Sequence, residues 1–140
     1  MILIADANII ISALIRNSKT RELLTIFSFT LYSPDTLLES IEKYKEEFIE
    51  KSGLTSKDFE ILLNFLLEKI TVVKQKEYKS KIEQAKSIIG HIDIEDIDYI
   101  ALALSMKNDG IWSDDAHFQK QDRIKIYKTE DIVKIVEKMK

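Results

Sequence analysis

Short apolar runs recur along the chain, and longer amphipathic segments separate them. The first run, "ILIA" at residues 2–5, is apolar at every position, which is typical of a strand buried on both faces of a sheet. Runs rich in β-branched and aromatic residues follow at 29–33, 70–74, 111–113 and 124–127, and this composition favours strands. The pattern therefore predicts about four to five strands.

The segments between these runs predict helices. In the segment that starts at Ile97, apolar residues recur at intervals of three and four positions, which is the helical period. The expected helices span about 8–16, 19–28, 34–52, 55–69 and 77–89, and two more begin near residues 96 and 129.

Several helix ends carry recognisable signals. Ser33 is expected to cap a helix that has Pro34 at its first position and ends at Gly53. Thr55 opens the motif "TSKD", which resembles a capping box with Asp in place of Glu. Thr129 is expected to cap the last helix, whose first turn contains two acids that the helix dipole favours.

Strands that alternate with helices predict an α/β fold. We expect a three-layer sandwich in which helices flank a mainly parallel central sheet of about four to five strands. The chain has 140 residues with only 3 Gly and 1 Pro, so it offers no linker and is expected to form one domain over residues 1–140. Ligands of such sheets bind beyond the carboxyl ends of the strands.

Composition narrows the class of protein. Hydrophobic residues make up 45% and charged residues 32%, a balance typical of globular rather than disordered chains. No apolar run approaches the roughly 20 residues of a membrane span, so no membrane partner is expected. The chain has no cysteine, which favours a cytoplasmic location and excludes a thiolate metal site, and its two histidines are too few for a histidine-based zinc centre.

Acidic residues follow two of the predicted strands. Asp6 ends the first strand and Asp115 follows the run at 111–113, so both are expected at the same edge of a parallel sheet. A carboxylate buried there without a partner would cost several kcal/mol, although Asp6 could instead cap the next helix. Asn8 has the same two interpretations, and Ser113 could bind a carboxylate or simply end its strand.

The segment "DIEDIDYIALAL" at 93–104 places four acids ahead of an apolar run. Capping explains one or two of them, but like charges at this spacing repel unless a cation or solvent intervenes. An EF-hand calcium loop is excluded, because from Asp93 its fifth position is Ile97 and its sixth is Asp98 rather than Gly. Asp96 directly precedes the helical pattern, which places it at the N-cap or in the first turn of that helix, at the strand-end surface.

Carboxylates that converge without Cys or His form an oxygen site, which suits Mg²⁺ or Mn²⁺ and supports metal-assisted hydrolysis. The formal charge of −3 argues against a broadly basic nucleic-acid protein. If four of the 24 acids bind a cation, however, the other 20 face 21 basic residues, which is compatible with a nucleic-acid partner.

Four segments resemble, in order, the sequence blocks of the PIN domain family, whose fold occurs in many prokaryotic toxin ribonucleases: "LIADANIIISAL" (3–14), "SPDTLLESIEKY" (33–44), "DIEDIDYIALALSM" (93–106) and "GIWSDDAHF" (110–118). The resemblance implies an acidic set of Asp6, Glu39, Asp96 and Asp115, with Asp93 as an auxiliary member. It favours Asp115 over Asp114 and selects Glu39, which composition alone does not distinguish from the acids around it.

The resemblance also implies a Mg²⁺- or Mn²⁺-dependent ribonuclease that cleaves single-stranded or structured RNA. Asp6, Asp96 and Asp115 would hold the metal, and Glu39 would be a further ligand or a base that positions water. Candidate phosphate-binding cations, each more often a plain solvated charge, are Arg16, Lys19, Arg21, Lys120 and Arg123.

Two other functions compete with this hypothesis. The chain could be a non-catalytic PIN-fold module that acts through a partner such as an antitoxin, although it retains all four core acids. A phosphatase of the haloacid-dehalogenase type needs an Asp where this chain has Asn8. The apolar helix expected at 59–70 could mediate a homodimer or could simply be buried in the core.

Overall fold

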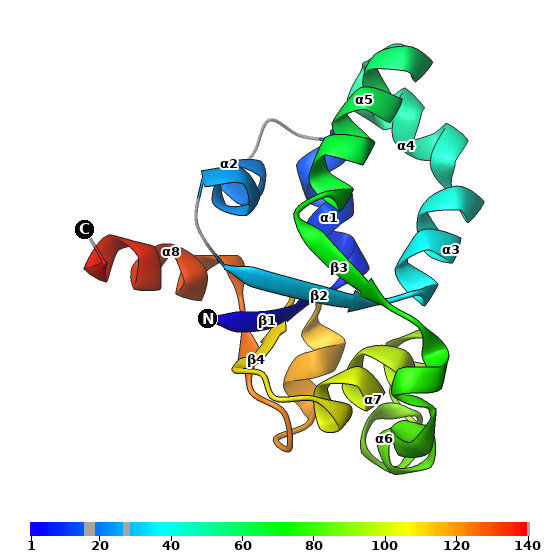
Figure 1. Cartoon of the computed structure of the whole chain (residues 1–140), viewed down its shortest axis with the longest axis vertical. Helices are drawn as coiled ribbons and strands as arrows, with labels where there is room; N and C mark the ends of the chain where they lie inside the picture. The colour runs from blue at the N-terminus through cyan, green and yellow to red at the C-terminus, as the bar shows by residue number, and fades with distance from the viewer. Residues whose placement is uncertain (16–18, 27–28, 140) are drawn as a thin grey trace.

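Five parallel strands form one sheet in a computed structural model of the chain, which describes residues 1–15, 19–26 and 29–139. The strands are β1 (Ile2–Ala5), β2 (Thr30–Pro34), β3 (Ile70–Val73), β4 (Gly110–Trp112) and β5 (Ile126–Tyr127). Their order across the sheet is β3-β2-β1-β4-β5, with β1 at the centre (Figure 1). The predicted parallel sheet is confirmed.

Helices cover both faces of the sheet (Figure 1). Their bounds are α1 (Ala7–Ile15), α2 (Lys19–Ile26), α3 (Thr36–Lys43), α4 (Lys45–Ser52), α5 (Ser56–Leu67), α6 (Ile82–Ile89), α7 (Ile97–Ser105) and α8 (Thr129–Lys138). In the described part of the chain, no helix is both long enough and apolar enough to cross a membrane.

Alternate strand residues divide the core into two layers. Leu3 and Trp112 point to one side, where they pack with α1 to α5 and α8, whereas Ile4 and Ile111 point to the other side, toward α6 and α7. This alternation follows from the two-residue period of a strand, and it explains why β1 is apolar at every position. The predicted three-layer sandwich is therefore confirmed.

The register of β1 and β4 determines which residues leave the sheet together. Ala5 pairs with Trp112, so the next residues, Asp6 and Ser113, leave the sheet side by side. The Asp6 N–H donates to the Trp112 carbonyl (3.1 Å) and the Ser113 N–H donates to the Tyr127 carbonyl (3.0 Å), which extends the backbone bonding one residue beyond β4.

The helix that was expected at 34–52 differs in the structure. Ser33 and Pro34 are the last residues of β2, because the Ser33 hydroxyl donates to the Ala5 carbonyl (3.0 Å) and Pro34 pairs with Val73. The helix begins after Asp35 and breaks at Tyr44, whose φ of −111° and ψ of 16° separate α3 from α4. The prediction that Ser33 caps this helix was wrong.

Of the other predicted helix ends, some agree with the structure and others differ from it. Gly53 ends α4 in the left-handed region and the Thr55 side chain accepts a hydrogen bond from the Asp58 N–H (3.1 Å), as predicted. The helix expected from residue 77 starts only at Ile82, after two short 3-10 turns. Thr129 is the first residue of α8 rather than its cap.

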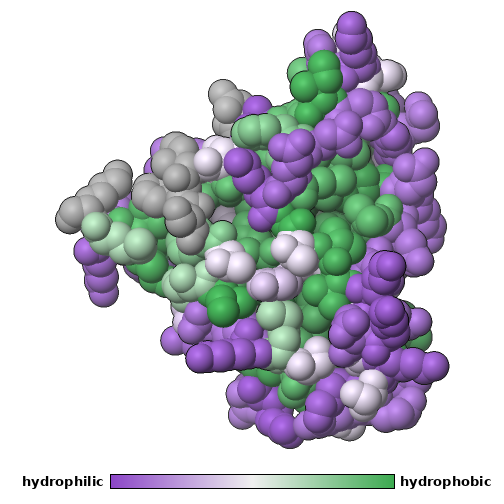
Figure 2. Space-filling view, in the orientation of Figure 1, coloured by the Kyte–Doolittle hydropathy of each residue, from purple (hydrophilic) through white to green (hydrophobic). Residues whose placement is uncertain are grey.

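Helix α5 combines buried and exposed apolar residues. Phe59, Leu63 and Leu66 are buried, whereas Ile61 and Phe65 are 60% and 44% exposed. Figure 2 shows hydrophobic residues across the middle of the face that it presents, with hydrophilic residues along its right and lower edges. The helix expected at 59–70 thus contributes to the core and also leaves apolar side chains in contact with solvent.

A substitution at Gly110, the first residue of β4, tests how closely the neighbouring backbone packs against this strand. We expect Gly110→Ala to lower the free energy of unfolding by about 2–4 kcal/mol, because φ is +145° and a new Cβ would lie 2.5 Å from the Lys125 carbonyl oxygen. Gly53→Ala is the matched control: φ is +71° but the space is open, so the loss should be about 1 kcal/mol. Urea denaturation measures both, and equal losses would contradict this account of β4.

Candidate metal centre

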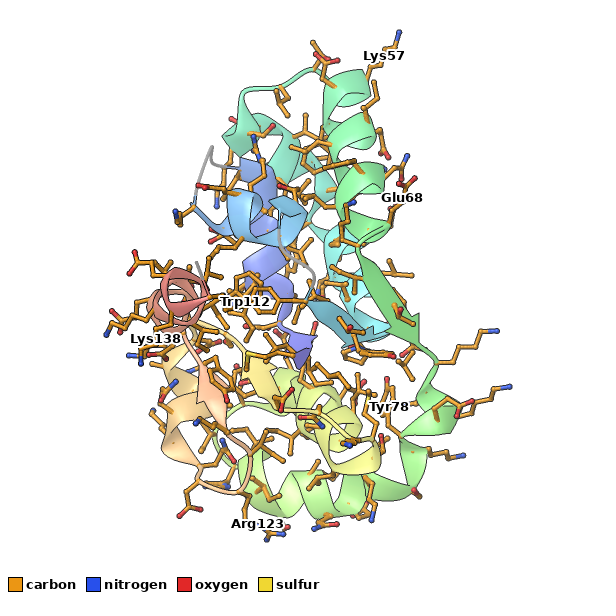
Figure 3. All side chains as sticks on the ribbon, turned by 60° about the vertical axis from the view of Figure 1, so that its left-hand side comes forward. Lys57, Glu68, Tyr78, Trp112, Arg123 and Lys138 are labelled. Carbon is orange, nitrogen blue, oxygen red and sulfur yellow. The ribbon has the colours of Figure 1, made fainter. Side chains whose placement is uncertain are left out.

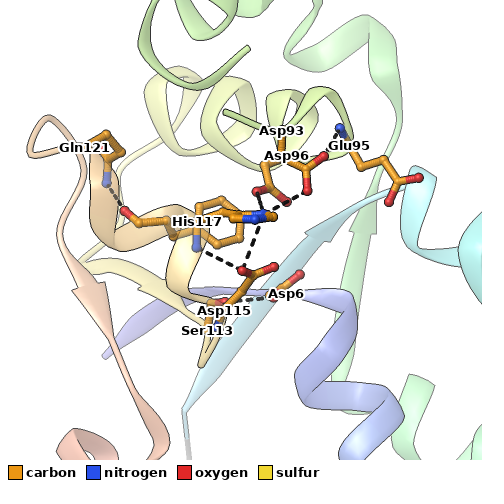
Figure 4. A network of polar contacts seen from close by, with 9 residues as sticks. Asp6, Asp93, Glu95, Asp96, Ser113, Asp115, His117 and Gln121 are labelled. Atoms are coloured by element: carbon orange, nitrogen blue, oxygen red, sulfur yellow. Dashed lines mark hydrogen bonds and ion pairs between the residues drawn. The ribbon is translucent and has the colours of Figure 1, made fainter. Parts of the chain in front are cut away.

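Carboxylates from three parts of the chain meet beyond the ends of β1 and β4 (Figure 4). Asp6 follows β1, Asp115 follows β4, and Asp93 and Asp96 flank the short turn before α7. These four residues line a pocket of about 400 Å³. The sequence-based expectation that these acids lie close together at the strand ends agrees with this geometry.

Asp6 is held from two sides. Its side chain is almost fully buried, and the Ser113 hydroxyl donates to its Oδ2 at 2.7 Å. The pKa of Asp6 is raised to about 6: burial raises it most, the Asp115 charge also raises it, and hydrogen bonds from Ser113 and from the backbone of Asn8 and Ala7 partly oppose the rise. Ser113 Oγ also accepts the Asp115 N–H at 3.0 Å, so one hydroxyl positions both carboxylates.

Asp96 is the most unusual carboxylate of the pocket. It occupies the N-cap position of α7, yet its side chain accepts no capping hydrogen bond. Its Oδ2 is buried and has no hydrogen-bond partner. The pKa of Asp96 is raised to about 8, first by burial and then by the charges of Asp93, Asp6 and Asp115.

An unpartnered buried oxygen among other carboxylates is costly unless a cation neutralises it. The donor set near Asp96 is mainly carboxylate oxygen, which is the chemistry that Mg²⁺ and Mn²⁺ prefer. The residues present therefore fit a divalent cation. Asp6, Asp96 and Asp115, the predicted ligands, line the pocket and could hold it, and this assignment stays a prediction.

A histidine also faces this cluster, and it was missed from the sequence. His117 Nδ1 lies 2.9 Å from Asp93 Oδ2, 3.6 Å from Asp115 Oδ1 and 3.9 Å from Asp96 Oδ2 (Figure 4). Its backbone N–H donates to Asp115 Oδ1 at 2.9 Å. The sequence feature that could have indicated His117 is its position two residues after Asp115, just beyond the end of a predicted strand.

Glu39 lies outside this pocket. It is exposed on α3 and lines a neighbouring depression of about 290 Å³ together with Glu95, Asp98 and Tyr99. Its predicted role in the acidic set therefore stays a prediction. Asn8 is exposed, and it lines the acidic pocket.

Asp98 and Asp114 make contacts elsewhere. Asp98 accepts a hydrogen bond of 3.3 Å from the Tyr78 hydroxyl, which also donates to Asp35 at 2.6 Å. Asp114 accepts the N–H (2.7 Å) and the hydroxyl (2.6 Å) of Thr129, at the first residue of α8. The two neighbouring acids Asp114 and Asp115 thus point to different parts of the molecule.

The predicted phosphate-binding cations do not line the acidic pocket where the structure describes them. Lys19 pairs with Glu22 at 3.5 Å, and the Arg21 Nε donates to the Ala13 carbonyl at 2.7 Å. Lys120 and Arg123 are exposed, and Arg123 lies at the lower end of the molecule in Figure 3. Arg16 lies outside the described residues. These assignments stay predictions.

The raised pKa values have a consequence for stability. Asp6 and Asp96 bind protons more tightly in the folded chain, so their contribution to metal-free stability should be greatest below about pH 4 and should be lost as pH rises through about 6 and 8. Asp96→Asn should raise the metal-free unfolding free energy at pH 8 by at least about 1.4 kcal/mol, the equivalent of one pKa unit. The exposed Asp122→Asn should not. Urea denaturation across pH tests this, and a flat wild-type profile would contradict it.

Substitutions of the neighbouring Asp114 and Asp115 can distinguish a contribution to stability from a contribution to metal binding. Asp114→Ala should lower the free energy of unfolding by about 1–2 kcal/mol through the lost contacts at α8, but the rise in melting temperature that Mn²⁺ causes should persist. Asp115→Ala should abolish that rise. Differential scanning fluorimetry with and without Mn²⁺ makes the comparison, and a reversed result would assign the site to Asp114.

Comparison with known proteins agrees with this geometry. A sequence model of the PIN domain matches residues 4–134, which is nearly the whole chain and includes every acid of the pocket. A search of curated proteins finds no match. The five-stranded parallel sheet, its flanking helices and the acids at the strand ends accord with the match, and the chain belongs to the PIN domain family.

Proposed function

We propose that this protein is a Mg²⁺- or Mn²⁺-dependent endoribonuclease whose metal is held by Asp6, Asp96 and Asp115. Members of the PIN family are generally metal-dependent nucleases. The observation that carries the proposal is the buried Asp96 oxygen that has no hydrogen-bond partner, with Asp6, Asp93 and Asp115 around it. A divalent cation is the partner that this carboxylate surrounding favours.

The bound cation would supply an activated water and would neutralise the charge that develops on the phosphate. The protein's own contribution is to hold the ligands still. Ser113 fixes Asp6 through Oδ2 and fixes Asp115 through its backbone N–H. Glu39, from the neighbouring depression, would complete the acidic set as a further ligand or as a base that positions water.

The rim of the pocket favours unpaired RNA. Tyr44 is 42% exposed at the break between α3 and α4, and it lines both the acidic pocket and the neighbouring depression. Lys43 Nζ lies 5.2 Å from the Tyr44 ring centre. An exposed ring beside a cation can stack an unpaired base while the cation contacts the backbone, which is the usual arrangement for single-stranded nucleic acid.

An alternative function is a non-catalytic module that acts through a protein partner such as an antitoxin or a second copy of the chain. The observation that favours it is the apolar surface of α5, where Ile61 and Phe65 are exposed beside Leu54. The two functions are compatible, since this surface does not overlap the residues that line the acidic pocket.

Cleavage of RNA is the direct test. Wild-type protein should cut a mixed pool of single-stranded RNA with Mn²⁺ or Mg²⁺ and should stop in EDTA. Asp96→Asn should reduce the rate by more than about 100-fold, the upper end of the loss for an outer-shell partner of a metal. Asp122→Asn is the control and should retain full activity.

The results distinguish the two functions. A folded wild-type protein that cuts no RNA with either metal would favour the partner module. Cleavage that survives Asp96→Asn would mean that the residues are assigned wrongly.

A further inference from the structure

An imidazole lies beside the carboxylates of the acidic pocket. In the described residues, Asp93, Asp96 and His117 each offer a ligand atom, and these atoms lie within 4.8 Å of one another. His117 comes from the 3-10 helix η4 (Ala116–Lys120), whereas the two acids come from the turn before α7 (Figure 4).

We propose that His117 adds an imidazole ligand, through Nδ1, to the metal site that contains Asp96, with Asp93 as a further carboxylate ligand, and that this nitrogen makes the site prefer Mn²⁺ over Mg²⁺. The inference rests on the metal site of the proposed function, but it does not require that the protein cleaves RNA.

The distances fit donors around one ion. In an octahedral site with bonds of about 2.1 Å, neighbouring donors lie about 3.0 Å apart and opposite donors about 4.2 Å apart. His117 Nδ1 lies 2.9 Å from Asp93 Oδ2 and 3.9 Å from Asp96 Oδ2. The first distance matches neighbouring donors and the second is slightly shorter than that of opposite donors, and all three ligand atoms lie within 4.8 Å of one another, so they can share an ion after a small movement.

The backbone keeps the imidazole in place. The His117 N–H donates to Asp115 Oδ1, and the next residue, Phe118, is fully buried, with its ring packed edge-to-face on Tyr99 at 6.3 Å. These contacts anchor both the start and the middle of η4. The His117 side chain is 41% exposed, so it lies at the pocket rim and not in the core.

Asp96 supplies independent support for a ligand at this position. Its side chain is only 8% exposed, and its Oδ2, the oxygen that faces His117, has no hydrogen-bond partner. Asp93 Oδ1 is already occupied by the Glu95 N–H at 2.9 Å, which leaves Oδ2 as the oxygen toward His117. One oxygen of each acid is therefore directed at the same position as the imidazole nitrogen.

The nitrogen changes which ions the site prefers. Carboxylate oxygens suit Mg²⁺ and Mn²⁺ alike, whereas imidazole is a ligand of transition metals and seldom of Mg²⁺. A site that contains His117 should therefore bind Mn²⁺ more tightly than an all-carboxylate site would, with little gain for Mg²⁺. The alternative is that His117 only hydrogen-bonds Asp93 and so orients it, in which case no nitrogen contacts the metal.

Electron spin echo spectroscopy of Mn²⁺-loaded protein separates the two readings, and it needs no RNA. We expect ¹⁴N modulation from one directly bound imidazole in the wild type and in His91→Gln, the control at the only other histidine, which is exposed. His117→Gln should lack the modulation. Wild-type protein labelled with ¹⁵N-histidine should replace the ¹⁴N pattern with a ¹⁵N pattern, which tests the inference even if His117→Gln fails to fold.

Calorimetry measures the preference between ions. His117→Gln should weaken Mn²⁺ binding at least tenfold and change Mg²⁺ binding less than threefold, whereas His91→Gln should change neither. Absence of nitrogen modulation in the wild type, or equal losses for both ions, would overturn the inference. Modulation without RNA cleavage would contradict the proposed nuclease alone, and metal-dependent cleavage without modulation would contradict the role of His117 alone.

Discussion

The pairing of β1 with β4 is the constraint on which the acidic pocket depends. Parallel strands end at the same edge of a sheet, and the register that sets Ala5 opposite Trp112 brings Asp6 next to Ser113. The serine hydroxyl then connects Asp6 to Asp115 through two short hydrogen bonds. A slip of one residue would turn every side chain of β4 to the opposite face and would separate these groups.

Packing several carboxylates into one buried pocket opposes folding, and the rest of the molecule must offset that cost. Two apolar layers, one on each face of the sheet, supply the burial. The pocket lies at the strand ends, where both layers stop and water can reach its mouth. That position lets the acids remain close together without being sealed in the core, and it keeps them accessible to a cation and a polar substrate.

Much of this arrangement could be predicted from the sequence, because strand ends and parallel order determine it. The short apolar runs predicted the sheet, and an acid after each of two runs indicated Asp6 and either Asp114 or Asp115, between which the family resemblance then chose Asp115. The helical period that starts immediately after Asp96 predicted its position at the start of a helix. Features that depend on contacts between residues far apart in the sequence could not be predicted. Ser33 has the local signal of a helix cap, yet a bond to the Ala5 carbonyl keeps it in β2.

His117 illustrates the same limit at the pocket. Its contact with Asp93 spans 24 residues, and a single sequence gives no measure of which turn folds back over the strand ends. Glu39 is the opposite case: a family pattern selects it, whereas its exposed position in the neighbouring depression gives no contact that singles it out. Local patterns predicted where the chain turns, but not which turns meet.

The two adjacent acids after β4 also connect the pocket with the start of the last helix, α8. Asp114 accepts hydrogen bonds from the N–H and the hydroxyl of Thr129, the first residue of α8, and the Trp112 indole N–H donates to that hydroxyl at 3.1 Å. Asp115, one peptide bond away, faces the acids. The start of α8 is therefore coupled to the pocket: a displacement of Thr129 would act on Asp114 and, through one peptide bond, on Asp115.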